Sequence, residues 1–347
     1  MRIVNAMFGT GSGGIEQAFI DYCNALTLAG HQVLAMVHPD AEIMDKLDAT
    51  GVEYVTRKNR GKWDLFAVRH LRRHLHQWQP DIMIAHGNRA ISLLRQCHYA
   101  ALLTGVCHNY KFKQLLKCDA LISVSQDMCH KVIEAGFPAS KIQVVPNMIQ
   151  LPEIPPKPEL VSHTNEDKVI GVAGRFVAKK GIDIFIRAVG ILKGRNVPFH
   201  AIIAGAGEED ARLRKLASDL GLNDKIRFVG WIEEKADFYT QIDLFCVPSL
   251  HEPFGIVVLE GFSYGLPVVS SDSEGPTEII TDGLNGLIVP KSDPVALADA
   301  LEKLLLNPEL AQKIGSSGLD EVKSSYALPV VSARLNEVLT HLPRAGT

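Results

Sequence analysis

Short apolar runs alternate with longer amphipathic segments along the chain. The runs at 1–7, 31–37 and 81–85 have the length and the continuous hydrophobicity of buried strands. The segments at 14–29 and 64–78 carry apolar residues at helical spacing. Strands that alternate with helices are typical of a parallel sheet with crossover helices, so the pattern predicts an α/β fold.

The alternation forms two series. In the first, the remaining predicted elements are strands at 52–56, 100–106, 119–124 and 141–145 and a helix at 125–135. The second begins with a strand at 169–173 and continues with strands near 199–204, 226–229, 242–247, 267–270 and 286–289, followed by a last helix at 328–341.

A proline-rich stretch separates the two series. Residues 151–158 read Leu-Pro-Glu-Ile-Pro-Pro-Lys-Pro, and polar residues follow up to Asp167. We therefore predict an N-terminal Rossmann-like domain over 1–150, a linker over 151–167, a second Rossmann-like domain over 168–327 and a C-terminal helical segment over 328–347. Two doubly wound parallel-sheet domains are expected to face a central cleft, where strand C-termini converge and ligands bind.

Composition indicates an ordinary globular protein. Its 347 residues, 46% hydrophobic and 22% charged, suffice for two cores. No apolar run approaches the roughly 18 residues of a membrane span, and the N-terminus has no apolar signal-peptide region. We therefore expect a cytoplasmic protein. The six cysteines show no Cys-x-x-Cys or Cys/His metal spacing, which predicts reduced, mostly buried thiols and no metal site.

Charge is unevenly distributed. Residues 1–150 hold 16 Lys and Arg against 12 Asp and Glu, whereas residues 151–347 hold 20 against 27. Much of the basic excess lies in 57–78, where an apolar stripe is flanked by basic side chains. This segment is either the solvated face of a core-packed helix or a docking surface for an anionic membrane or a phosphorylated acceptor. The stripe is Leu65, Val68, Leu71, Leu75 and Trp78, and Arg69, Arg72, Arg73 and His76 lie off it. Nucleic acid is not an expected partner, because the chain is net acidic and has no recognised binding motif.

The stretch 248–261 carries the most conspicuous chemistry. It follows the apolar run 242–247, and a helix is predicted to begin near Pro253, because proline suits the first helical position. The free N–H groups of such a helix start form an anion site suited to phosphate. Glu252 lies at its mouth and Glu260 lies two turns further along a mostly apolar helix. These carboxylates either cap the helix and pair with basic side chains, or bind sugar hydroxyls.

In each domain, a glycine-containing loop follows the first strand. In 174–181, Arg175 and Lys180 can hold one diphosphate from two directions. In 9–14, the sequence satisfies the Gly-x-Gly-x-x-Gly pattern of a Rossmann dehydrogenase. That fingerprint also requires an acid near the end of the second strand, and Asp40 comes late and follows a proline, so the match is incomplete.

Together these motifs resemble a known enzyme family. Ser-x-x-Glu-Pro-Phe-Gly with Glu-x7-Glu at 249–260, Gly-Arg-x4-Lys-Gly at 174–181 and Gly-Gly-x-Glu at 13–16 are similar to the signatures of retaining GT-B glycosyltransferases of the GT4 family, glycosyltransferase group 1. The resemblance covers almost the whole chain. The segment Asn147-Met148-Ile149 departs from the family's usual Asn-Gly-Val/Ile-Asp.

The resemblance implies roles for particular residues. Glu252 and His86 would orient the donor sugar, Arg175 and Lys180 would stabilise the leaving diphosphate, and Glu260 would bind the ribose. The other implied donor-site residues are Gly13, Gly14, Ile232, Pro253, Phe254, Gly255 and Ile256, with Ile232 near the base. On the acceptor side the candidates are Glu16 and His108.

The implied activity is retaining transfer of a hexose or N-acetylhexosamine from a nucleotide-diphosphate sugar, with a UDP-sugar favoured over GDP-mannose. The acceptor would be a hydroxyl of a glycan or lipid-linked glycan in cell-surface polysaccharide or lipopolysaccharide synthesis. No metal and no cofactor besides the nucleotide-sugar co-substrate is expected. The basic N-terminal domain would allow peripheral contact with the inner face of the cytoplasmic membrane.

Other functions remain open at this point. A GT-B glycoside phosphorylase or a sugar-nucleotide epimerase would use the same cleft. An NAD-dependent dehydrogenase would use the loop at 9–14 and leave Glu252 and Glu260 unexplained. A non-catalytic nucleotide-sugar-binding protein would keep the donor residues without the reaction.

Overall fold

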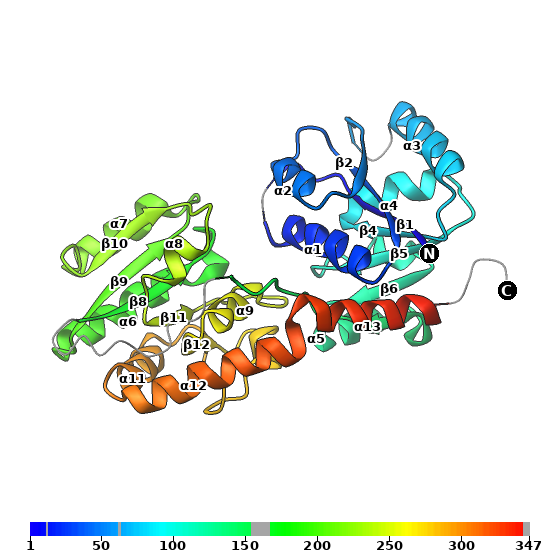
Figure 1. The fold of residues 1–347 in the computed structure, drawn as a ribbon. Coiled ribbons are helices and arrows are strands. Elements are labelled where there is room, and N and C mark those ends of the chain that lie inside the picture. Colours follow the sequence, from blue (N-terminus) through cyan, green and yellow to red (C-terminus); the bar gives the residue numbers. More distant parts are fainter. Residues whose placement is uncertain (12, 62–63, 154–166, 343–347) are drawn as a thin grey trace. The chain divides into compact units, whose positions relative to one another are not determined.

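The computed structural model describes the chain except residues 12, 62–63, 154–166 and 343–347. The chain forms two compact units (Figure 1). Unit 1 comprises Met1–Gln150 and the chain from Tyr326 onward, and unit 2 comprises Leu151–Ser325. Most of the predicted linker lies outside the described residues.

Unit 1 is built on a parallel sheet. Its described residues form seven strands in the order β3-β2-β1-β4-β5-β6-β7. All neighbouring pairs are parallel, and in register Asn5 of β1 lies beside Ile84 of β4. The strands are β1 (Arg2–Met7), β2 (Gln32–Val37), β3 (Glu53–Thr56), β4 (Ile82–His86), β5 (Leu102–Cys107), β6 (Ala120–Ser123) and β7 (Ile142–Val144).

Helices connect these strands. They are α1 (Gly14–Leu28), α2 (Met44–Ala49), α3 (Leu65–Trp78), α4 (Gly87–Gln96) and α5 (Gln126–Glu134), with short 3-10 turns at Leu115–Lys117 and Ala139–Lys141. The side chain of Asn5 donates to the carbonyl of Phe19 at 3.1 Å and so ties β1 to α1. Strands β1, β4 and β5 are buried along nearly their whole length because helices cover the sheet.

Unit 2 repeats this plan. Its described residues form six parallel strands in the order β10-β9-β8-β11-β12-β13. The strands are β8 (Lys168–Ala173), β9 (Phe199–Ala204), β10 (Ile226–Gly230), β11 (Leu244–Val247), β12 (Val268–Ser271) and β13 (Leu287–Val289). The helices are α6 (Ile182–Gly194), α7 (Asp210–Asp219), α8 (Ala236–Tyr239), α9 (Ile256–Ser263), α10 (Pro276–Ile279), α11 (Pro294–Leu305) and α12 (Pro308–Glu321), with a 3-10 turn at Ala178–Lys180.

Each sheet has a point where the direction of its strand order reverses. In unit 1 the chain builds outward from β1 to β3 and then returns to place β4 on the other side of β1. In unit 2 the same reversal separates β8 from β11. Loops that leave the two central strands at their carboxyl ends diverge there, so ligands of doubly wound sheets bind at this switch point.

The predicted fold class and strands are confirmed. Every strand expected from the apolar runs is present, with bounds that shift by at most two residues. One helix start was wrong: α9 begins at Ile256 rather than near Pro253, because Gly255 adopts a left-handed conformation with φ of 97° immediately before it. The described part of the chain contains no helix both long and apolar enough to cross a membrane.

The last helix, α13 (Leu328–His341), packs on α1 within unit 1. The hydroxyl of Ser332 donates to the carbonyl of Ala25 in α1 at 2.6 Å. The chain returns to unit 1 at Tyr326, whose carbonyl accepts from Ile149 N–H at 3.0 Å, two residues before the predicted boundary at Leu328. A turn of π-helix, Val322–Tyr326, precedes this return.

Helix α3 differs from the predicted amphipathic helix in two respects. Leu65, expected on the buried stripe, is 75% exposed, and its neighbour Phe66 is 79% exposed. Arg72, expected on the solvated face, donates to the carbonyls of Gln96 and Cys97 at 3.1 and 2.7 Å. Arg72 therefore satisfies carbonyls at the C-terminal end of α4.

Because α13 packs within unit 1, we expect its buried side chains to contribute to the stability of that unit. Leu335 is fully buried, so Leu335→Ala should lower the free energy of unfolding by about 2–5 kcal/mol. Chemical denaturation followed by circular dichroism measures the loss. Glu337→Ala on the exposed face of the same helix is the control, and equal stability of both variants would contradict the assignment.

Candidate active site

The switch point of unit 2 brings a cation and a carboxylate together. Lys180 follows β8 and Glu252 follows β11, and these strands are neighbours in the sheet. The Lys180 ammonium donates to Glu252 Oε2 in a partly buried ion pair. Two residues that are far apart in sequence, each singled out from its own motif, thus lie in direct contact.

Backbone contacts hold the two loops against each other. Leu250 N–H donates to the carbonyl of Lys179 at 2.8 Å. Gly181 has a φ of 62°, and a Cβ at this position would lie 2.0 Å from the carbonyl oxygen of Pro248. Only glycine permits both this conformation and this close approach. The contact between Lys180 and Glu252 therefore depends on the glycine that follows the lysine.

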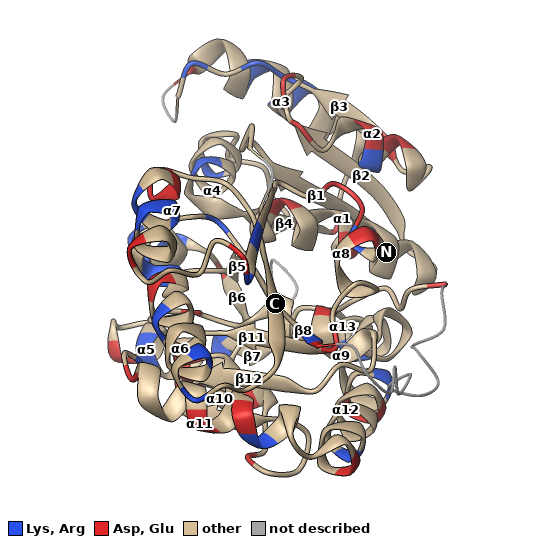
Figure 2. Cartoon of the chain, turned by 90° about the vertical axis from the view of Figure 1, so that its left-hand side faces the viewer, with Lys and Arg blue, Asp and Glu red and all other residues tan. Residues whose placement is uncertain are grey.

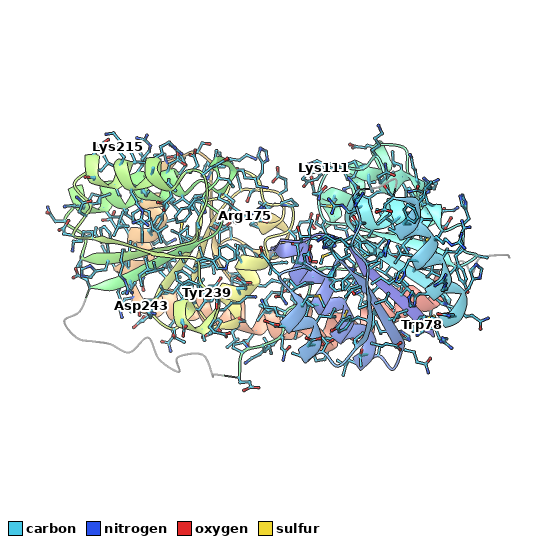
Figure 3. The ribbon with its side chains drawn as sticks, turned by 90° about the horizontal axis from the view of Figure 1, so that it is seen from above. Trp78, Lys111, Arg175, Lys215, Tyr239 and Asp243 are labelled. Carbon is cyan, nitrogen blue, oxygen red and sulfur yellow. The ribbon has the colours of Figure 1, made fainter. Side chains whose placement is uncertain are left out.

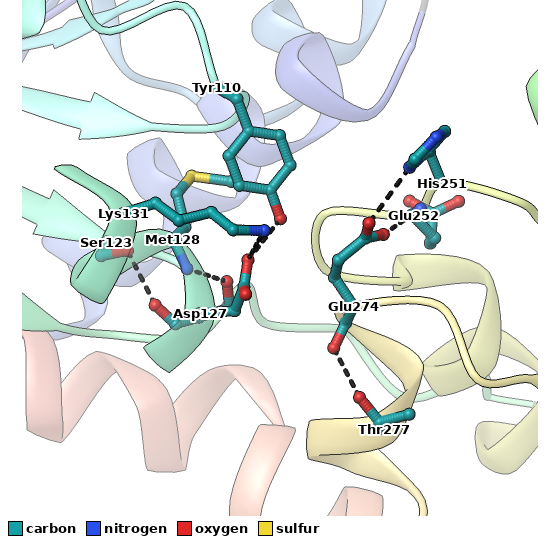
Figure 4. Close-up of polar contacts among 10 residues, drawn as sticks. Tyr110, Ser123, Asp127, Met128, Lys131, His251, Glu252, Glu274 and Thr277 are labelled. Atoms are coloured by element: carbon teal, nitrogen blue, oxygen red, sulfur yellow. Dashed lines mark hydrogen bonds and ion pairs between the residues drawn. The ribbon is translucent and has the colours of Figure 1, made fainter. Parts of the chain in front are cut away.

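Another acid, Glu274, forms hydrogen bonds to the loop that carries Glu252 (Figure 4). One carboxylate oxygen accepts from the N–H of Glu252 at 3.2 Å, and the other lies 3.1 Å from His251 Nδ1. In return, Gly275 N–H donates to the carbonyl of Glu252 at 2.8 Å. Burial alone would raise the pKa of Glu274, but hydrogen bonds from its own N–H, from His251 and from Glu252 together lower it. Glu274 is therefore ionised and fixes the backbone of Glu252.

The start of α9 presents unpaired backbone donors. Gly255 is the N-cap residue, and among the described residues no acceptor faces the N–H groups of Gly255, Ile256 and Val257. Phe254 is buried below them, and Pro253 lies before the helix rather than at its first position. Free N–H groups at a helix start attract anions.

Arg175 supplies a second cation after β8. Its side chain is exposed, and Figure 3 labels it. Within the described chain its guanidinium has no ion-pair partner, in contrast to Lys180. A guanidinium without a partner can bind a phosphate through two parallel hydrogen bonds.

Glu260 lies on α9 with both carboxylate oxygens occupied. Tyr239 hydroxyl donates to Oε2 at 2.8 Å, and Lys235 Nζ lies 2.7 Å from Oε1. The Glu260 side chain is 12% exposed and that of Lys235 is 43% exposed. The predicted basic partner of Glu260 is thus present, together with a buried tyrosine. Ile232, predicted near a nucleotide base, is half-buried in the loop between β10 and α8.

The glycine loop of unit 1 follows β1 and ends at the N-terminus of α1. Gly13 is the N-cap residue of α1, and Gly14 is its first residue. The carboxylate of Glu16 folds back over the loop, so that a Cβ at Gly9 would lie 2.9 Å from Glu16 Oε1. Asp40, which a dinucleotide site would need, forms a 2.9 Å ion pair with Lys58.

His86 and His108 form a hydrogen-bonded pair at the switch point of unit 1. His86 Nδ1 lies 2.9 Å from His108 Nε2. The ring of His86 is 2% exposed and contacts Tyr22 edge-on, with 4.8 Å between ring centroids. Its buried Nε2 has no hydrogen-bond partner in the described part of the chain. The structure thus brings these two predicted residues together and buries His86.

Burial keeps both imidazoles neutral near pH 7. Burial, reinforced by the charge of His108, lowers the pKa of His86 well below its ordinary value. Burial alone lowers the pKa of His108 to about 4. The pair therefore shares hydrogen bonds between neutral rings, and a proton added to either ring would be disfavoured.

The cysteines and the possible metal-ligating side chains can be surveyed in the part of the chain that the structure describes. The cysteines of the chain are buried free thiols, as predicted: Cys23, Cys97, Cys107, Cys118, Cys129 and Cys246. Over the described ranges, no group of three or more His, Cys, Asp and Glu side chains is arranged to hold a metal ion.

Comparison with known proteins identifies the class of this protein. The family model "Glycosyl transferases group 1" matches residues 157–320, and the model "Glycosyltransferase Family 4" matches residues 12–152. The matches span the motifs of both units, and this chain belongs to the GT4-like group 1 glycosyltransferases. It is thus a glycosyltransferase of the kind that uses nucleotide sugars.

Individual relatives match this chain over nearly its whole length, and a solved structure shares its fold. The lipopolysaccharide core biosynthesis glycosyltransferase LpsD of Rhizobium meliloti is 29% identical over 94% of this chain and 94% of its own length. LpsE of the same organism is 27% identical over 99% of this chain and 100% of its own length. The structure of Anabaena HepE in complex with UDP and glucose matches with a TM-score of 0.86 at 20% identity, covering 99% of this chain and 100% of that one. This likeness establishes the GT-B fold.

Sequence reasoning missed three residues of the site. Tyr239 and Lys235 contact Glu260, and Glu274 contacts the backbone of Glu252. Glu274 comes three residues after the end of β12, so the tendency of ligand sites to lie at strand C-termini could have indicated it. No pattern in the sequence indicates that Tyr239 faces Glu260.

The buried histidine pair predicts a specific loss of stability in acid. The pKa of His108 is lowered to about 4, so between pH 6.5 and 4 the unfolded chain binds a proton that the folded chain does not. Stability is fully present above the unfolded pKa and falls as the pH drops through this window, by as much as about 3 kcal/mol. His108→Asn should flatten the slope in urea denaturation at several pH values. A variant with the same slope as the parent would contradict the assignment.

Proposed function

We propose that this chain transfers a hexose or N-acetylhexosamine, with retention of anomeric configuration, from a nucleotide-diphosphate sugar to a hydroxyl of a glycan or lipid-linked glycan. A UDP-sugar is the favoured donor. The observation that carries the proposal is the collection, within unit 2, of a carboxylate, two cations and unpaired helix amides at one switch point. These are Glu252, Arg175, Lys180 and the N–H groups of 255–257.

The cations and amides suit a departing diphosphate. When the bond between the anomeric carbon and the phosphate oxygen breaks, its electron pair stays on the phosphate and negative charge develops there. Arg175, Lys180 and the α9 amides would stabilise this charge, because donors and cations fixed where charge develops lower the barrier. The proposed enzyme accordingly requires no metal and no cofactor.

The carboxylates suit the sugar and the ribose. Glu252 accepts hydrogen bonds from the donor sugar after Lys180 turns to the diphosphate, and Glu260 accepts from the ribose hydroxyls. The base lies beside Ile232. The acceptor hydroxyl attacks the face from which the diphosphate leaves and gives its proton to a phosphate oxygen, so configuration is retained. Residues of unit 1 serve the sugar and the acceptor: Gly13, Gly14, Glu16, His86 and His108.

The names of similar proteins support the choice of donor and pathway. The Anabaena structure contains UDP and glucose, which favours uridine over guanosine. Two full-length relatives are named for lipopolysaccharide core biosynthesis, which favours a lipid-linked cell-surface glycan as acceptor. A phosphorylase or epimerase would act without such an acceptor.

A lipid-linked acceptor makes contact with a membrane surface part of the proposal. Helix α3 begins with two exposed apolar residues, Leu65 and Phe66, and continues with exposed Arg69 and Arg73. Figure 2 shows basic residues, coloured blue, along this helix. Apolar side chains beside basic ones favour the interface of an anionic bilayer. The protein would then work at the inner face of the cytoplasmic membrane.

Nucleotide binding tests the donor site. Titration calorimetry with UDP, GDP, ADP and NAD should show tight binding of one nucleoside diphosphate, with UDP expected. Glu260→Ala should lower the affinity for this nucleotide roughly 10- to 100-fold, which is the loss expected when hydrogen bonds to a charged group are removed. Glu309→Gln, an exposed acid at the start of α12, is the matched control. EDTA should leave transfer unchanged. Binding of NAD alone, indifferent to Glu260, would overturn the proposal.

Vesicle co-sedimentation tests the membrane contact. The double variant Arg69→Gln/Arg73→Gln should lose about tenfold or more in affinity for anionic vesicles, at about 1 kcal/mol per basic residue near the surface. Arg72 is kept because it caps α4. Lys215→Gln on α7 is the control. If the double variant sediments with anionic vesicles as fully as the parent, α3 is only a solvated helix.

A further inference from the structure

Helix α8 carries two donors that meet the carboxylate of Glu260. Lys235 is the residue before this short helix, and Tyr239 is its last residue, one turn later. The N–H of Tyr239 donates to the carbonyl of Lys235 at 3.0 Å, so one helical turn sets the spacing of the two side chains. They reach different carboxylate oxygens, Tyr239 at 2.8 Å and Lys235 at 2.7 Å.

The two donors differ in their surroundings. Tyr239 is buried, and its ring stacks on Tyr264 at 5.0 Å and meets Phe245 edge-on at 5.3 Å. Burial, followed by the charge of Glu260, raises the pKa of Tyr239 well above its ordinary value, so the hydroxyl keeps its proton. Lys235 is exposed and on a flexible stem. Tyr239 is thus a fixed donor, whereas Lys235 is an exchangeable one.

We propose that Tyr239 is a positioning residue that fixes the Glu260 carboxylate for recognition of ribose hydroxyls. This inference rests on the proposed function and deepens it. The aromatic cage fixes the ring, the ring fixes its hydroxyl, and the hydroxyl holds Oε2 in place. Lys235 pairs with Oε1 and yields it to the nucleotide, because the exposed lysine side chain can exchange this partner for water or another anion.

Holding one Glu260 oxygen in place should affect the binding of some nucleotides more than others. A carboxylate held in one rotamer accepts from vicinal hydroxyls without losing side-chain freedom on binding. A carboxylate that rotates must be ordered by the ligand. The benefit of Tyr239 therefore applies only to ligands that carry ribose hydroxyls and is absent for a nucleotide that lacks them.

The experiment compares UDP with 2′,3′-dideoxy-UDP by calorimetry on the full chain. The parent should bind UDP at least about tenfold more tightly than the dideoxy compound, as expected for lost hydrogen bonds to a carboxylate. In Tyr239→Phe this ratio should fall to about threefold or less, with the dideoxy affinity unchanged. The KM for the donor should rise while kcat changes little, since Tyr239 does not touch the reacting atoms.

Controls separate positioning from folding. Phenylalanine keeps the ring among its aromatic neighbours, so the melting temperature of Tyr239→Phe should lie within a few degrees of that of the parent. An equal loss of affinity for both nucleotides would indicate a general disturbance of the site and would overturn the proposal. Lys235→Met should preserve most of the ratio. If Lys235→Met removes the discrimination and Tyr239→Phe does not, the exposed lysine is the positioning group and the inference is wrong.

The test also distinguishes this inference from the proposed function. If Glu260→Ala removes ribose discrimination and Tyr239→Phe retains it, Glu260 binds ribose unaided and only the role of Tyr239 fails. If the parent binds both nucleotides alike, Glu260 does not contact the ribose and the inference fails. If the parent binds no nucleoside diphosphate, the proposed donor site and this inference fail together.

Discussion

The ion pair between Lys180 and Glu252 is the contact on which the site of unit 2 depends. It joins the loops after β8 and β11, the two strands between which the strand order reverses. Separating two partly buried charges is costly unless each gains another partner. A nucleotide sugar offers both replacements, a diphosphate for the lysine and hydroxyl donors for the glutamate. The pair joins the two loops in the free chain. Under the proposed function it would give way to a ligand that satisfies both ends at once.

Around this pair, each functional group has a neighbour that holds it. Glu274 fixes the backbone of Glu252, and Tyr239 fixes the carboxylate of Glu260. Gly181 allows the loop of Lys180 to approach Pro248. In unit 1, His108 holds the ring of His86. Such supports reduce the reorganisation that binding would otherwise require, which is how a site on loops attains the precision that group transfer needs.

The sequence predicted the two sheets well, because buried parallel strands leave short, mostly apolar runs separated by helical segments. The motifs that it singled out in unit 2 lie together in the structure, where Lys180 pairs with Glu252. It predicted the start of α9 wrongly, because the left-handed conformation of Gly255, and not the proline, sets that start. It placed Leu65 in the core because helical spacing shows which face of a helix is apolar and does not show which turns of that face are covered. The contacts of Glu274 and Tyr239 join segments about 20 residues apart. Tertiary packing makes both contacts, so the sequence shows neither of them, although Glu274 follows the end of β12, where ligand sites of doubly wound sheets tend to lie.

The position of α13 has a consequence for how the chain is made. Unit 2 is continuous in sequence, whereas unit 1 is closed by a helix that follows unit 2 along the chain. During synthesis, residues 1–150 leave the ribosome without the helix that covers α1, and unit 2 can complete its core first. The apolar face of α1 stays uncovered until the final helix emerges. A nascent chain arrested before Leu328 would therefore carry a second unit with all its elements and a first unit whose helix α1 lacks its partner.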